Sequence, residues 1–178
     1  IEAEGWLEAK ACVGIFPANR VGDDIEIYAD ETRKTVLASV PTLRQQGAKS
    51  GTQPNLALAD FVAPVGTPDW LGAFCVTAGI GVAERAAEME ADQDDYQSIM
   101  LKAMADRLAE ANAEYHHQLV RADLWGSAAH EKLDNEALIK EEYVGIRPAP
   151  GYPACPDHSI KRTLFALLNA TENTGVSL

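Results

Sequence analysis

The chain has 178 residues, with 15 Lys or Arg against 27 Asp or Glu, so its formal net charge is −12 at neutral pH. Hydrophobic residues make up 47% and charged residues 24%, which is typical of a globular domain that buries its own core. The acidic excess argues against a nucleic-acid or anionic membrane partner, because both require clustered Lys and Arg.

The longest uncharged stretch, residues 70–83, is too short and too rich in glycine to cross a bilayer. Residues 1–4 lack the basic and apolar regions of a signal peptide. The three cysteines are widely spaced and odd in number, so they define no disulfide framework. We therefore expect a reducing, cytoplasmic setting. Because the chain starts at Ile1 and stops at an apolar Val176-Ser177-Leu178, we also expect a fragment that is incomplete at both ends.

The first half of the chain predicts strands, because short apolar runs alternate with turn residues. These runs occupy residues 11–16, 25–28, 35–40, 56–65 and 71–77. Residues 17–19 and 22–24 have turn chemistry and are expected to connect the first two strands. Residues 44–56, rich in Gln, Gly, Ser, Thr and Pro, are expected to form a loop.

The second half predicts helices, and the longest lies near residues 94–122. Its apolar residues recur with the spacing of one helix face: Tyr96, Met100, Met104, Leu108, Ala111, Tyr115 and Leu119. Over those positions the helix would be about 36 Å long. Shorter helices are expected over residues 84–90, 135–143 and 159–168. Strands followed by helices indicate one α+β domain.

Three familiar patterns fail on inspection. Gly79-x-Gly81 lacks the third glycine of a dinucleotide-binding loop, since Glu84 stands there, and no βαβ alternation surrounds it. His116 and His117 diverge by about 100° on a helix, and Cys155-x-x-His158 has no second ligand pair. No Ser or Cys lies in a nucleophile setting. We predict no catalytic and no metal-ligating residue.

An acidic cluster lies between the two halves of the chain. Its members are Glu84, Glu88, Glu90, Asp92, Asp94 and Asp95. A solvated helix face is the simpler interpretation, and a docking patch for a basic partner is the alternative.

Residues 145–158 differ from the rest, because four of the nine prolines fall among them. Each proline fixes φ and removes a donor, so the segment is neither helix nor central strand. Pro150-Gly151 has the composition of a type II turn, and Asp157 or Ser159 is suited to cap the following helix. A stiff loop loses little entropy when it binds a ligand. From composition alone, a ligand-binding loop and a structural crossover stay equally open.

This loop, Arg147-Pro-Ala-Pro-Gly-Tyr-Pro-Ala-Cys-Pro-Asp-His158, resembles the signature loop of the activation domain of cobalamin-dependent methionine synthase. The resemblance extends along nearly the whole chain. It includes Gly14-Ile-Phe-Pro-Ala-Asn19, Gly22-Asp-Asp-Ile25, Asp94-Asp95-Tyr96, Lys102-Ala-Met-Ala-Asp-Arg-Leu-Ala-Glu110, Leu124-Trp125-Gly126 and Glu172-Asn-Thr-Gly175. It implies a single curved α+β domain, with a twisted antiparallel sheet and flanking helices, covering residues 1–178.

The resemblance also implies a function. Such a domain binds S-adenosylmethionine (AdoMet) without a Rossmann fold and supports the reductive methylation of inactive cob(II)alamin to methylcobalamin, which reactivates methionine synthase. Cobalamin is bound by another module of the same protein, and flavodoxin or a similar reductase supplies the electron. Reduced cobalt is itself the nucleophile, so no catalytic dyad is required. The isolated chain is not expected to turn over alone.

Site residues are carried over by motif. Arg147 is expected to hold the AdoMet carboxylate, and the backbone at Ala149 and Gly151 to meet its amino groups. Tyr152 is expected to lie between AdoMet and the corrin, with its ring facing the sulfonium. Glu110 matches a position near the ligand, although a solvated helix carboxylate is an equally good interpretation. The family also has an acidic contact upstream of this chain and aromatic contacts beyond Leu178.

A second function stays open. The chain would then be a non-enzymatic interaction domain that caps a cobalamin-binding or flavodoxin-like partner without appreciable AdoMet binding. Affinity for AdoMet distinguishes the two hypotheses.

Overall fold

The computed structural model describes residues 5–178. Residues 1–4, where the sequence shows no signal peptide, lie outside the described part. The chain divides into two compact units. The helical unit contains the chain up to Cys12, Phe74–Val144 and Ala170–Ser177. The sheet unit contains Val13–Ala73 and Gly145–Asn169, together with Leu178.

Four strands form one sheet in the order β3-β2-β1-β4. They are β1 (Glu8–Val21), β2 (Asp24–Tyr28), β3 (Val36–Pro41) and β4 (Asp69–Ile80). β2 pairs antiparallel with both of its neighbours, with Ile27 opposite Ala18 of β1 and opposite Ala38 of β3. The predicted α+β class with an antiparallel sheet is confirmed.

The prediction of a turn at residues 17–19 is wrong, because β1 runs through them to Val21. The side-chain amide of Asn19, only 1% exposed, donates hydrogen bonds to the carbonyl oxygens of Ala63 (3.1 Å), Pro64 (3.1 Å) and Thr67 (2.7 Å). A residue type that favours turns is thus held in a strand by acceptors more than forty residues away.

The predicted strand over residues 56–65 is also wrong. The segment holds instead a short 3-10 helix, η1 (Leu58–Phe61). A carboxylate oxygen of Asp60 accepts a hydrogen bond from the backbone N–H of Ala57 at 2.9 Å, which closes the turn. The same side chain pairs with Arg44 at 2.6 Å. This local bond gives the backbone an alternative to strand pairing.

The core of the sheet unit combines residues from the strands, the η1 region and the C-terminal part of the unit. Its buried members are Ala18, Ile25, Ile27, Val40, Ala59, Val62, Cys155 and Ile160. Leu164 and Leu167 of α4 (Ile160–Leu168) pack against this cluster. The predicted helix at residues 159–168 is therefore confirmed, and its apolar face covers the core.

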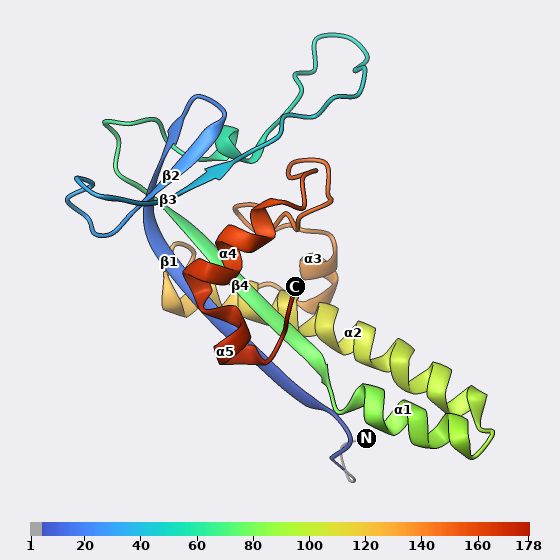
Figure 1. The fold of residues 1–178 in the computed structure, drawn as a ribbon. Helices are drawn as coiled ribbons and strands as arrows, with labels where there is room; N and C mark the ends of the chain where they lie inside the picture. Colours follow the sequence, from blue (N-terminus) through green and yellow to red (C-terminus); the bar gives the residue numbers. More distant parts are fainter. Residues whose placement is uncertain (1–4) are drawn as a thin grey trace. The chain divides into compact units, whose positions relative to one another are not determined.

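The helical unit is built around a hairpin of two helices, α1 (Val82–Ala91) and α2 (Asp95–Leu119), which pack along each other (Figure 1). Asp94 caps α2 by accepting a hydrogen bond from the N–H of Gln97 at 3.1 Å. α2 continues as one π-helical turn, η2 (Val120–Leu124), so the predicted long helix near 94–122 is confirmed.

Two short helices complete the helical unit: α3 (Asn135–Ile139) and α5 (Ala170–Thr174). α3 ends four residues before the predicted limit of residue 143. Glu141 adopts a positive φ of 56°, a conformation that ends a helix.

The apolar face expected from the periodicity of α2 is largely exposed. Tyr96 is 70% exposed and Tyr115 59%, whereas Ser98, Leu101 and Ala105 are buried. Small residues lie where α2 meets α1, and the hydroxyl of Ser98 donates to a carboxylate oxygen of Glu90 at 2.7 Å. Close helix contact and a polar bond, rather than the largest apolar side chains, therefore decide which face is buried.

Candidate ligand-binding loop

The proline-rich segment 145–158 lies in the sheet unit and contains neither helix nor ladder strand. The N–H of Tyr152 donates to the carbonyl oxygen of Ala149 at 3.1 Å, and Gly151 between them has a φ of +103°. The predicted turn at Pro150-Gly151 is therefore present. A second turn follows, in which Gly151 donates to Cys155 (2.8 Å) and Cys155 donates to Tyr152 (2.8 Å). These bonds make the loop tip, residues 149–155, compact.

The C-terminal side of the loop is anchored in the core. Cys155 is 4% exposed and Ile160 is 3% exposed, and both belong to the core cluster of the sheet unit. Burial raises the pKa of the Cys155 thiol, with a further contribution from the charge of Asp157. Its place in the core fits a packing role.

The start of α4 differs in detail from the expected cap. Ser159 occupies the N-cap position, but its side chain makes no capping bond. Instead the carboxylate of Asp157 accepts hydrogen bonds from the Ser159 hydroxyl and from the Ser159 N–H, the latter at 2.9 Å. These bonds lower the pKa of Asp157. The result is a closed turn that joins the loop to α4.

Four of the five predicted AdoMet-binding residues lie together on this loop. Arg147 is half-buried, Ala149 and Gly151 are exposed, and Tyr152 is 64% exposed. Glu110 lies on α2 in the helical unit, where its exposed carboxylate pairs with Arg107 at 2.8 Å. This ion pair within one helix fits the solvated-carboxylate interpretation, and the ligand role of Glu110 stays a prediction.

Cys155 and His158 have a spacing that is found in zinc sites. In the structure, however, Cys155 is buried in the core and His158 is exposed. Instead, a Cβ placed on Gly151 would lie 2.7 Å from Nε2 of His158. The imidazole therefore packs directly on the loop tip. The sequence alone does not predict this contact, because the six residues between Gly151 and His158 form irregular chain without a periodic signal.

A buried ionic cluster in the helical unit was also missed. Arg121, 3% exposed, donates from Nε and Nη2 to a Glu131 carboxylate oxygen at 3.0 and 2.9 Å. Its Nη1 lies 2.5 Å from Nδ1 of His117, and its guanidinium lies 4.1 Å from the ring centre of Tyr143. The cluster ties the segment after the π-helical turn to the end of α2. Within residues 5–178, no group of three His, Cys, Asp or Glu residues is arranged to hold a metal ion.

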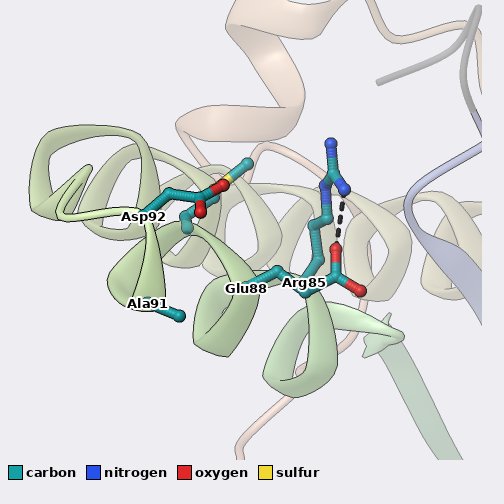
Figure 2. A pocket seen from close by; sticks show the side chains of 5 residues that line it. Arg85, Glu88, Ala91 and Asp92 are labelled. Carbon is teal, nitrogen blue, oxygen red and sulfur yellow. Dashed lines mark hydrogen bonds and ion pairs between the residues drawn. The ribbon is translucent and has the colours of Figure 1, made fainter.

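The acidic cluster is mostly engaged in helix structure. Arg85 pairs with Glu88 at 2.7 Å, Lys102 pairs with Glu90 at 2.7 Å, and Asp94 caps α2. Hydrogen bonds from Lys102 and Ser98 lower the pKa of Glu90. The Arg85–Glu88 pair also lines a small pocket, and Figure 2 shows its lining residues, which all lie on α1 or at its C-cap. These contacts fit the solvated-face interpretation.

No helix in the described part of the chain is both long enough and apolar enough to cross a membrane.

The fold has a close counterpart among solved structures. A crystal structure of the MetH reactivation domain bound to AdoHcy matches with a TM-score of 0.93 and 56% sequence identity, over 99% of this chain. The match covers 55% of that chain, so the present chain spans about half the length of this relative.

The family model described as vitamin B12 dependent methionine synthase, activation domain, matches residues 1–178. The chain therefore belongs to this family, and the resemblance drawn from the sequence motifs is confirmed.

Proposed function

We propose that this chain is an AdoMet-binding module that supports the reductive methylation of cob(II)alamin to methylcobalamin and so reactivates methionine synthase. The observation that carries the proposal is the compact, core-anchored loop of residues 147–152 in a chain 56% identical to a reactivation domain bound to AdoHcy. AdoHcy is AdoMet without the transferred methyl group, so a site that holds one has most of the groups needed for the other.

The groups on the loop fit AdoMet chemically. The guanidinium of Arg147 suits the carboxylate of the methionine moiety, because two parallel N–H groups match two carboxylate oxygens. The hydrogen bonds of the turns use the carbonyl oxygens of Ala149, Tyr152 and Cys155, which leaves those of Pro150 and Gly151 to accept from amino groups of a ligand. The exposed Tyr152 ring provides a π face for a sulfonium cation.

The bound ligand would supply an activated methyl group, and the residues of this chain bind and orient it. Positioning of this kind lowers a barrier without an acid, base or nucleophile from the protein. We place cobalamin on another module of the same protein and assign the electron to flavodoxin or a similar reductase. The three cysteines are free thiols, which supports a reducing, cytoplasmic setting.

Calorimetric titration with AdoMet tests the proposal. We expect the chain to bind and Arg147→Ala to lose more than about 1.5 kcal/mol of binding free energy, because a charge-assisted hydrogen bond is removed. Arg162→Ala is the matched control, since Arg162 is an exposed arginine of α4 in the same unit. It is expected to bind like the parent chain.

Equal affinity of Arg147→Ala and the parent chain would remove Arg147 from the site. Absence of AdoMet binding by the parent chain would contradict the proposal for this chain and favour the interaction-domain alternative. A pull-down with a cobalamin-binding module then tests that alternative directly.

A further inference from the structure

One contact on the loop tip is not explained by the residues assigned to AdoMet. The imidazole of His158 faces the α-carbon of Gly151, where a Cβ would lie 2.7 Å from Nε2 and 2.9 Å from Cε1. At separations this short, a side chain at residue 151 would force the imidazole of His158 to shift. Gly151 also needs its positive φ of 103°, which most other residues reach only with strain.

His158 is itself held by the start of α4. Its carbonyl oxygen accepts a hydrogen bond from the N–H of Lys161 at 3.1 Å, in the first turn of the helix. The next helical residue, Ile160, is 3% exposed and belongs to the core. The imidazole therefore projects from a backbone position that the core fixes, and it meets the loop tip from that position.

The loop tip needs such a support. Glycine at positive φ has more conformational freedom than other residues, so a turn centred on it loses more entropy when it becomes ordered. The hydrogen bond from Gly151 N–H to the Cys155 carbonyl restrains the tip through its backbone. The ring of His158 supplies a packing contact in addition to this hydrogen bond.

We propose that His158 is a positioning residue for AdoMet: its imidazole packs against Gly151 and holds the Ala149–Tyr152 turn in the conformation that accepts the ligand. The inference rests on the proposed AdoMet-binding function of the loop. Because His158 is exposed, its side chain contributes little to the core, and its replacement is expected to leave the fold intact.

The test compares AdoMet titrations of the full 178-residue chain with those of His158→Ala and His158→Phe. Loss of the ring is expected to weaken binding about tenfold, because the free loop must then be ordered by the ligand. Phenylalanine keeps a planar ring of similar position, so His158→Phe is expected to recover most of the affinity. His130→Ala, an exposed histidine of the helical unit, is the control for loss of a histidine elsewhere.

A second readout needs no ligand. The aromatic ring shifts the NMR resonances of the Gly151 α-protons, and this shift is expected to disappear in His158→Ala and to persist in His158→Phe. Thermal unfolding of each variant is measured alongside, and unchanged midpoints separate positioning from a general loss of stability.

The inference is overturned if His158→Ala binds AdoMet as tightly as the parent chain or leaves the Gly151 resonances unchanged. Failure of His158→Phe to recover affinity contradicts a packing role. If the parent chain itself binds no AdoMet, the proposed function fails, and the Gly151 resonances still decide whether His158 holds the turn.

Discussion

Asp60 shows how one side chain organises the longest loop of the sheet unit. Its carboxylate pairs with Arg44 at 2.6 Å and Arg20 at 3.6 Å, and it accepts the N–H of Ala57 at 2.9 Å. The Arg44 hydrogen bonds, followed by the Ala57 N–H, lower the pKa of Asp60 from 3.8 to about 2. A carboxyl whose pKa is lower in the folded state stabilises the protein above its ordinary pKa, and this stabilisation is lost as the pH falls toward 2.

We therefore expect the parent chain to lose about 1 kcal/mol more free energy of unfolding than Asp60→Asn when the pH is lowered from 7 to 3. Urea unfolding at both pH values measures the difference. Glu31→Gln, at an exposed carboxylate of the same unit, is the control and is expected to follow the parent chain. Parallel pH profiles for the parent chain and Asp60→Asn would show that the ion pair contributes nothing to stability.

At the same scale, the proximity of four predicted site residues followed from the sequence, and their role toward AdoMet stays a prediction. Arg147, Ala149, Gly151 and Tyr152 are close in sequence, so a motif in one loop is enough to bring them together. The positive φ of Gly151 follows from local turn chemistry. The contact of His158 with Gly151 depends on the direction in which α4 leaves the core. Sequence spacing does not predict that direction.

The helices show which properties of an element are local. The span of α2 follows from a helical periodicity that was visible in the sequence, whereas the cap at Asp94 was not predicted. The buried face was not predicted either, because its interior consists of Ser98, Leu101 and Ala105, whereas larger apolar side chains remain exposed. On this helix, therefore, the largest apolar side chains are not the buried ones.

This separation makes a matched pair of substitutions informative. Leu101 is 2% exposed and Met104 is 43% exposed, on the same helix and three residues apart. We expect Leu101→Ala to lower the free energy of unfolding by about 2–4 kcal/mol, because it leaves a cavity, and Met104→Ala to cost less than about 1 kcal/mol. Urea unfolding of both variants checks the assignment. The reverse order would mean that the Met104 face is covered in solution.

At the scale of the whole molecule, two strands link the units. Residues 8–12 of β1 and 74–80 of β4 belong to the helical unit, and the remaining residues of both strands belong to the sheet unit. Each of these two strands therefore contributes residues to both units. The prediction of a single domain stays a prediction, and cooperativity tests it.

We expect one cooperative transition for both units. Trp70 lies in the sheet unit, and Trp6 and Trp125 lie in the helical unit. Fluorescence of Trp70→Phe therefore reports on the helical unit, and that of the double variant Trp6→Phe, Trp125→Phe reports on the sheet unit. Each variant is compared with its own circular dichroism, and coincident urea midpoints are expected in both. Midpoints that differ between the two probes of one variant would show that the units unfold independently.

The sequence by itself determined the features that depend on neighbouring residues. The α+β class, the long helix, the turn at Pro150-Gly151 and the family motif all follow from residues within a few positions of one another. Turns and periodicity act over one or two helical turns, so their chemistry can be seen without the fold.

Only the tertiary structure decided where distant groups meet. Asn19 is in a strand because carbonyl groups 44 to 48 residues away accept its amide protons. Leu101 rather than Met104 is buried on α2, the helix that packs against α1. His158 lies on Gly151 because α4 is seated on the core. In each case the free energy comes from a non-local partner, and the same residues without that partner would favour another conformation.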